Sequence, residues 1–322
     1  RGGIMMMDGY IVSKRKVAVI GAGFVGASIA YALTIRNLAR EIVLIDIDRE
    51  KTEGEAMDIQ HGIPDLGNAV VRAGSYEDCR DCDLIIITAG RNRKPGESRL
   101  DLIAGNSGIL RNVVEQMQKY YTGGVIMLVS NPVDVLVYQC TRWMGLPDGR
   151  VFGTGCALDS SRMIRLMADY TKRDTESVKI NIVGEHGDSQ IPIWSRAAVD
   201  GIPMQEYCEK HGLSWTQEIR DDFAGKVRGM GASIIKNKGR THFGIATSVC
   251  YLASAVLDQR PTIASVSTVL KGEYGVSGVG LSVPSIIGVN GVERRLEEEW
   301  TEEELTLFRQ AADKMKGVLD TL

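Results

Sequence analysis

Three residues in the second half of the chain combine a proton donor, a carboxylate and an anion-binding cation. His186 lies in the run Gly-Glu-His-Gly-Asp-Ser, residues 184–189, which directly follows a short apolar stretch. A histidine pKa near neutrality suits proton transfer, and the nearby glycines leave room for a ligand. Asp159 lies at the start of a helix that we predict over residues 160–170, and Arg162 lies one turn along its face. We expect Asp159 to orient and charge His186, since an adjacent negative charge raises a histidine pKa.

Each of these residues also has a structural explanation that involves no chemistry. A lone histidine is more often structural than catalytic, an aspartate at a helix start often serves as an N-cap, and an arginine one turn on often forms a surface ion pair. The histidine gains weight as a catalytic residue because an acidic partner is available. With an arginine to bind a substrate carboxylate, the three groups would make a complete site for hydride transfer.

A polar segment in the first half of the chain carries two further arginines. Arg93 and Arg99 lie six residues apart in the run 91–99, which directly follows an apolar strand predicted over residues 84–88. Arginine is the side chain best shaped to grip a carboxylate with two parallel hydrogen bonds. The pair therefore indicates an anionic substrate, and two carboxylates on that substrate would engage both. The alternative is a basic loop that only faces water.

The elements around these residues begin with a glycine-rich turn. A strand predicted over residues 17–20 runs into Gly-Ala-Gly-Phe-Val-Gly and then into a helix predicted over 27–33. The first glycine allows a tight turn, the second lets the backbone approach a pyrophosphate, and the third lets helix and strand pack closely. The helix N-terminus offers N–H groups to the phosphates. The predicted dinucleotide-binding residues are Gly21, Gly23, Phe24, Val25 and Gly26.

Asp46 identifies which dinucleotide the turn would bind. It lies 20 residues after Gly26, at the end of a strand predicted over residues 41–46. A carboxylate there binds the adenine ribose hydroxyls and repels the 2′-phosphate of NADP, so we expect NAD as the cofactor. The alternative is that Asp46 only begins a loop.

Strands and helices alternate through the first half of the chain, which predicts an α/β fold. Further strands are predicted over 69–73 and 125–129, and further helices over 51–60, 100–120 and 133–143. This pattern indicates a Rossmann doubly wound parallel sheet, in which ligands bind beyond the carboxyl ends of the strands. The glycine turn, the polar segment and residues 130–132 all fall there.

The second half reads as a mixed α/β substrate domain. Helices are predicted over 221–236, 243–257 and 301–322, and antiparallel strands with turns over 262–290. We therefore expect an NAD-binding Rossmann domain over residues 15–155 and a catalytic domain over residues 156–322.

Composition excludes several classes of protein. The chain has 322 residues and a net charge of −3, which argues against a nucleic-acid partner. No apolar run reaches membrane-spanning length, and the first residues lack the apolar core of a signal peptide. The six cysteines are scattered, so we expect reduced thiols and a cytoplasmic location. Cys79 and Cys82 would fit a redox pair or half a zinc site, but no second pair follows, so we predict a packing role and no metal.

A series of motifs in one order carries a resemblance to a known family. The chain resembles the L-lactate/L-malate dehydrogenase family over nearly its whole length, with motifs at residues 21–26, 46, 88–90, 96–99, 130–134, 158–162 and 184–189. The resemblance implies a tetramer or dimer and a small 2-keto or 2-hydroxy acid as substrate.

The resemblance also implies a role for each site residue. His186 would be the general acid in reduction and the base in oxidation, with Asp159 orienting it. Arg162 would bind the substrate C1 carboxylate, Arg99 would polarise the reacting carbonyl, and Asn131 would hydrogen-bond the reacting oxygen. The residues implied at the cofactor, beyond the glycine turn and Asp46, are Thr88, Ala89, Gly90 and Asn131.

The residue six before Arg99 selects the substrate in this family. It is usually glutamine in lactate dehydrogenases and arginine in malate dehydrogenases, and here it is Arg93. We therefore expect malate and oxaloacetate, because an arginine facing the pyruvate methyl would leave a desolvated charge unpaired. Residues 184–189 and Thr241, which lies where the lactate branch narrows the site, resemble that branch instead. L-Lactate dehydrogenase remains the alternative.

Two further expectations concern regulation and inactivity. Lactate dehydrogenases activated by fructose 1,6-bisphosphate carry an arginine and a histidine where this chain has Ile164 and Lys179, so we expect no strong activation. A non-catalytic NAD-binding structural module is the alternative from another class. The complete set of site residues argues against it.

Overall fold

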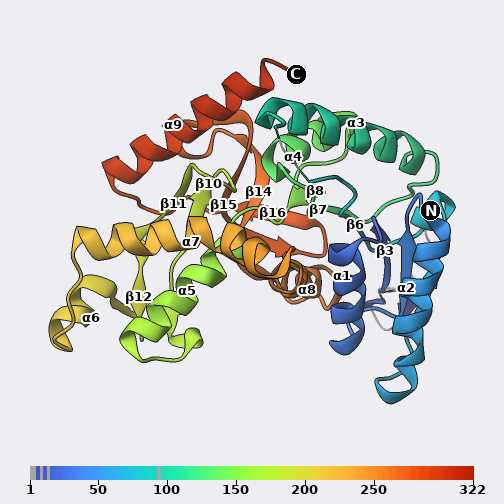
Figure 1. Cartoon of the computed structure of the whole chain (residues 1–322), viewed down its shortest axis with the longest axis horizontal. Helices are drawn as coiled ribbons and strands as arrows, with labels where there is room; N and C mark the ends of the chain where they lie inside the picture. Colours follow the sequence, from blue (N-terminus) through green and yellow to red (C-terminus); the bar gives the residue numbers. More distant parts are fainter. Residues whose placement is uncertain (1–4, 8–9, 13–14, 93–95) are drawn as a thin grey trace.

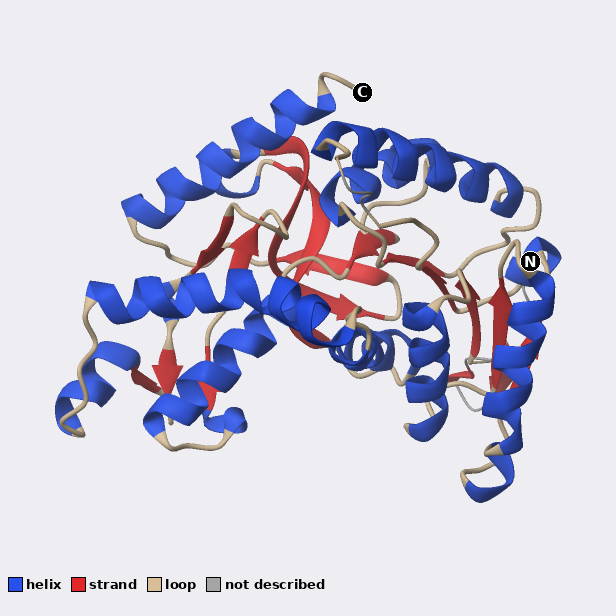
Figure 2. Ribbon diagram, in the orientation of Figure 1, coloured by secondary structure: helices blue, strands red, loops and turns tan. Residues whose placement is uncertain are grey.

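The computed structural model describes residues 5–7, 10–12, 15–92 and 96–322, with the main chain alone at 5–7, 10–12 and Arg99. Arg93 therefore lies outside the described residues. A single 11-stranded sheet forms the middle layer of this part of the chain, and helices cover both of its faces (Figure 2). Its strand order is β11-β10-β15-β14-β8-β7-β6-β3-β4-β5, with β16 paired to β15.

One half of the sheet is parallel and has the doubly wound order predicted from the sequence. From β8 to β5 every neighbouring pair is parallel, and the order reverses between β3 and β6. The parallel strands are β3 (Lys16–Ile20), β4 (Glu41–Ile45), β5 (Val70–Ala73), β6 (Leu84–Ile87), β7 (Val125–Leu128) and β8 (Val151–Gly153). Ligand-binding loops in such sheets gather at the reversal point, which here lies beside the glycine turn and the polar segment.

Alternate residues of the parallel strands point to opposite faces of the sheet and belong to two separate hydrophobic cores. In β3, Val17 and Val19 face the core beneath α1 and α8 (Phe243–Leu257), whereas Ala18 and Ile20 face the core beneath α3 and α4 (Figure 1). The helices of this half are α1 (Phe24–Ile35), α2 (Arg49–His61), α3 (Arg99–Met117) and α4 (Val133–Met144). Burial on both faces explains why these strands read as unbroken apolar runs.

The antiparallel half continues the same sheet beyond β8. Ser267 of β14 pairs with Gly153 of β8, so the two halves share one hydrogen-bonded sheet. These strands are β10 (Ile182–Gly184), β11 (Gln190–Pro192), β14 (Thr262–Lys271), β15 (Ser277–Gly288) and β16 (Gly291–Arg295). The antiparallel strands predicted over 262–290 are confirmed, and β16 lies beyond the predicted stretch.

Most of the remaining elements lie around the antiparallel half, whereas α8 packs against α1 and the strands β1 and β2 form a short N-terminal hairpin. The helices are α5 (Ala157–Thr171), α6 (Met204–Lys210), α7 (Gln217–Lys238), α8 (Phe243–Leu257) and α9 (Glu302–Leu319). The small strands are β1 (Met5–Met7), β2 (Tyr10–Val12), β9 (Val178–Lys179), β12 (Ala198–Val199) and β13 (Ile202–Pro203). None of the helices in residues 15–92 and 96–322 combines the length and apolarity needed to cross a bilayer.

Cys79 and Cys82 lie buried just before β6. Both thiols are free, and burial raises the pKa of each to about 12. A thiol that stays protonated is a poor nucleophile and metal ligand, which agrees with the predicted packing role.

Candidate active site

The glycine turn follows β3 and closes against the end of β6. Gly21 has a φ of 105°, and a Cβ added there would stand 2.6 Å from Thr88 Oγ1. A Cβ added to Gly26 would stand 1.8 Å from the Gly21 carbonyl oxygen, so both positions require glycine. Thr88 Oγ1 donates to that carbonyl at 2.8 Å, and the Ala89 N–H donates to the carbonyl of Ile20 at 3.0 Å. Thr88 and Ala89 therefore lie beside the turn.

This turn fits the phosphates of a dinucleotide. No side chain in the described part of the chain caps the N-terminus of α1, and a Cβ added to Gly23 would meet nothing within 4 Å. The first N–H groups of α1 are thus available to an anion. Asp46 is held next to the turn, where its Oδ2 accepts the Ala22 N–H at 2.6 Å and its Oδ1 accepts the Asp48 N–H at 3.2 Å. A carboxylate fixed there suits ribose hydroxyls.

Asp159 joins His186 and Arg162 in one buried cluster. Helix α5 begins at Ala157 instead of the predicted Ser160, with Cys156 as its N-cap, so Asp159 lies inside the first turn and does not cap the helix. Its side chain is only 2% exposed. Its Oδ2 lies 2.6 Å from His186 Nδ1, and its Oδ1 accepts a hydrogen bond from Arg162 Nη1 at 3.0 Å. The structure therefore brings together the three residues that the sequence singled out.

A second buried carboxylate holds the main chain of His186. The loop that carries His186 links β10 to β11, and Asp134 Oδ2 accepts the His186 N–H at 2.8 Å. Asp134 Oδ1 in turn accepts the Ser267 hydroxyl at 2.6 Å. Burial raises the pKa of Asp134 to about 6, although both hydrogen bonds act to lower it. Asp134 lies in the motif at residues 130–134 that carries the family resemblance, but we predicted no role for it from the sequence.

The charge of His186 is set by opposing effects. Burial lowers its pKa, but the hydrogen bond and charge of Asp159, together with the charge of Asp134, outweigh burial and raise the pKa above its ordinary value. The side chain is 27% exposed, so a ligand can reach it. With Nδ1 directed at Asp159, Nε2 is the nitrogen left for proton exchange with a substrate.

Asn131 lies in the loop after β7, and Asn106 links its main chain to the main chain that follows β6. Asn131 is exposed, and its carbonyl accepts a hydrogen bond from Asn106 Nδ2 at 2.6 Å. Asn106 is buried on the inner face of α3, between Ile103 and Leu110. Sequence reasoning missed it, although a polar residue within the apolar stripe of a helix signals a buried hydrogen-bonding role.

The other predicted substrate residues are placed less completely. A capping box between Ser98 and Asp101 starts α3 at Arg99, whose side chain lies outside the described structure. Thr241 lies in the junction between α7 and α8, and makes no hydrogen bond or ion pair with the His186 cluster among the described residues. Its neighbour His242 forms a hydrogen bond through Nδ1 with Ser28 Oγ at 2.9 Å, so the junction packs against α1. Across residues 15–92 and 96–322, no three His, Cys, Asp or Glu side chains form a group able to hold a metal.

Comparisons with known proteins agree with this geometry. The model of the lactate/malate dehydrogenase NAD-binding domain matches residues 15–153, and that of the family's α/β C-terminal domain matches residues 156–322. An L-lactate dehydrogenase of Acetivibrio thermocellus is 40% identical over 308 residues, covering 96% of this chain and 97% of that protein. An L-lactate dehydrogenase of Priestia megaterium is 40% identical over 315 residues, covering 98% and 99%.

A solved structure extends the likeness to three dimensions. The minor L-lactate dehydrogenase from Enterococcus mundtii, in its ligands-bound form, has a TM-score of 0.93 and 40% identity. The match covers 96% of this chain and 99% of that one. The resemblance read from the sequence motifs is thereby confirmed. The chain belongs to the lactate/malate dehydrogenase family and is an oxidoreductase with an NAD-binding domain.

Proposed function

We propose that this protein reversibly reduces a 2-keto acid to an L-2-hydroxy acid. The observation that carries the proposal is the cluster of Asp159 with His186 and Arg162, at 2.6 Å and 3.0 Å. When bound, NADH supplies the hydride. Protonated His186 gives its proton to the carbonyl oxygen of the keto acid, and in the reverse direction neutral His186 removes the hydroxyl proton. Asp159 holds the ring and stabilises its charged form.

The remaining groups bind and orient the anionic substrate. The contact with Asp159 fixes the Arg162 guanidinium, and we assign its other N–H groups to the C1 carboxylate. Asn131 and Arg99 are assigned to the reacting oxygen, and stabilise the charge that develops on it. Thr241 is assigned to the wall of the substrate site. Thr88, Ala89, Gly90 and the glycine turn are assigned to NAD.

Pyruvate and L-lactate are the substrate pair that we propose first. The relatives described above are named L-lactate dehydrogenases and align over nearly their whole length. The malate preference inferred from Arg93 receives no support from them. Oxaloacetate and malate remain the second candidate, because an arginine at that position would pair with the second carboxylate of oxaloacetate.

A two-substrate assay tests the choice. We expect kcat/KM with NADH to be higher for pyruvate than for oxaloacetate, and the reverse order would replace the first candidate by the second. Arg93→Gln should raise the pyruvate-to-oxaloacetate ratio by roughly 30-fold to a few thousand-fold, the effect of removing one partner of a close ion pair. An unchanged ratio would show that Arg93 does not read the substrate. If the folded protein binds NADH but oxidises it with neither acid, it is a non-catalytic NAD-binding module.

Assembly and location complete the proposal. We propose a homodimer or homotetramer, supported by large apolar side chains exposed on neighbouring helices: Phe24, Tyr31 and Ile35 of α1, Met57 of α2, and Phe243 and Tyr251 of α8. Light scattering coupled to gel filtration would measure the mass directly. The buried, free cysteines support a cytoplasmic location. We also propose that the two domains divide between residues 155 and 156.

A further inference from the structure

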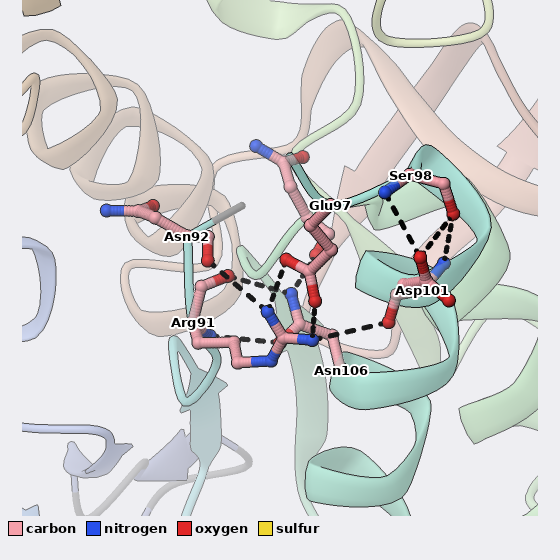
Figure 3. A network of polar contacts seen from close by, with 7 residues as sticks. Arg91, Asn92, Glu97, Ser98, Asp101 and Asn106 are labelled. Carbon is pink, nitrogen blue, oxygen red and sulfur yellow. Dashed lines mark hydrogen bonds and ion pairs between the residues drawn. The ribbon is translucent and has the colours of Figure 1, made fainter. Parts of the chain in front are cut away.

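The polar segment after β6 is anchored at its ends by contacts to which the proposed reaction assigns no role (Figure 3). We propose that Arg91, Gly105 and Asn106 are positioning residues that hold the main chain at Arg91 against α3 and against Asn131. They would thereby keep Asn131 and the start of α3 at the separation that the keto acid requires. This inference rests on the proposed function, and goes beyond it by naming what holds that part of the site.

The side chain of Arg91 ties the two ends of the segment together. Its Nη1 and Nη2 donate to the two carboxylate oxygens of Glu97 at 2.7 Å and 2.5 Å, which is a two-pronged pair. Its Nη2 also donates to the Asp101 carbonyl at 3.3 Å, inside the first turn of α3. Such a pair fixes the direction of the guanidinium as well as its distance. The chain therefore leaves β6 and enters α3 at two points that are bound to each other.

Gly105 provides the space in which this guanidinium lies. A Cβ added to Gly105 would stand 2.5 Å from Arg91 Nη2 and 2.8 Å from Nε. Those distances are shorter than any van der Waals contact, so a methyl group there would displace the guanidinium. Glycine is otherwise unfavourable within a helix, because it costs more backbone entropy than alanine does. The contact with Arg91 gives a reason for its presence.

Asn106 connects the same point to the active site. Its Oδ1 accepts the Arg91 N–H at 2.9 Å, and its Nδ2 donates to the Arg91 carbonyl at 3.1 Å. The same Nδ2 donates to the Asn131 carbonyl at 2.6 Å. One buried amide thus bonds the main chain that follows β6 to the main chain that follows β7. Figure 3 shows Asn106 close to the Arg91–Glu97 pair, with its amide hydrogen-bonded to the Arg91 main chain.

The most discriminating test compares two glycines of the same helix. Gly105→Ala would push the Arg91 guanidinium away, whereas Gly108→Ala is the matched control because a Cβ there meets nothing within 4 Å. Alanine favours helix, so neither variant should lower the Tm. We expect Gly105→Ala to reduce kcat/KM for the keto acid by about 10- to 100-fold, chiefly through KM, since small displacements of substrate-positioning groups have effects of this size. Gly108→Ala should match the wild type, and NADH affinity should be unchanged in both.

A double-variant cycle tests the ion pair itself. Arg91→Ala and Glu97→Ala should each reduce kcat/KM, and the double variant should be no worse than either, because both remove one contact. Arg91→Lys should recover part of the loss. Arg165→Ala is the control, since Arg165 makes a similar two-pronged pair with Asp169 on the exposed face of α5.

The outcomes separate this inference from the proposed function. Wild-type kcat/KM in both Gly105→Ala and Arg91→Ala would overturn the inference alone. Additive losses in the Arg91–Glu97 cycle, or an equal loss in Gly108→Ala, would also overturn it. A folded wild type that binds NADH but reduces neither keto acid would overturn the proposed function and this inference together.

Discussion

His186 and the two described ends of the polar segment, Arg91 and Glu97, are fixed by different kinds of contact. Two buried carboxylates hold His186, one at the ring and one at the main chain. At the described ends of the segment, Arg91 pairs with Glu97 through a side chain that is 31% exposed, and the neutral amide of Asn106 binds the Arg91 main chain. Hydrogen bonds to buried charges are stronger than neutral or exposed ones. The comparison indicates that His186, the group which changes charge, is fixed most firmly. Substitutions at His186 and its carboxylates should therefore reduce activity more than substitutions at Arg91 or Glu97.

The largest effect should follow loss of the proton donor. His186→Gln keeps a polar side chain of similar reach but has no group that titrates near neutrality. We expect kcat to fall by about 10²- to 10⁴-fold, the usual contribution of a general acid–base group. NADH affinity, measured by fluorescence titration, should stay at the wild-type value because the glycine turn is intact. A kcat within tenfold of wild type would show that His186 is not the proton donor.

Asp159→Asn should have the next largest effect, on both rate and pH dependence. The pKa of His186 is raised, so the protonated acid persists above its ordinary pH range, and keto-acid reduction declines only as the pH rises through the raised pKa. The stability that the Asp159–His186 pair contributes to the fold is likewise lost as the pH rises through the raised pKa of His186. Without the carboxylate, the decline should move to lower pH, and kcat should fall by about 10²-fold. Profiles of kcat and kcat/KM against pH would measure the fall in rate and the shift of the pH limit. An unmoved pH limit would contradict the assigned role.

The two regions also differ in how far the sequence could predict them. His186, Asp159 and Arg162 carry the chemistry in their residue types, and the alternation of strands and helices was enough to predict the parallel sheet. Asp134 meets Ser267 across 133 positions of sequence, and no local pattern indicates that contact. The space that Gly105 leaves for Arg91 likewise appears only once β6 and α3 pack together. The continuity of the sheet past β8 depends on one such distant pairing, between Ser267 and Gly153.

The smallest effect should come from removing the charge, but not the hydrogen bonds, of Asp134. In Asp134→Asn the amide oxygen can still accept the His186 N–H, and the amide nitrogen can donate to the Ser267 hydroxyl, which then reverses its role. We expect kcat within about tenfold of wild type, since the hydrogen bonds that hold the loop of His186 in place are kept. The pH limit of reduction should move down less than in Asp159→Asn, because the charge of Asp134 is a lesser contributor to the raised pKa of His186. Asp134→Ala removes both hydrogen bonds and should lose more activity, which separates hydrogen bonding from charge.

The stability of Asp134→Asn gives the sharper measurement. The folded protein holds the Asp134 proton up to a pKa of about 6, whereas the unfolded chain loses it near the ordinary value, so ionising this buried group destabilises the fold as the pH rises between the two. This difference between the folded and unfolded pKa of Asp134 corresponds to about 3 kcal/mol in the free energy of unfolding. Asparagine does not ionise, so the variant should lack this loss of stability from pH 4 to pH 6, and its advantage over wild type should grow with pH in that window. Denaturant unfolding at several pH values would test this. If the two proteins differ in their free energy of unfolding by the same amount at every pH, Asp134 is ionised throughout. Both carboxylates that hold His186 would then carry a full charge.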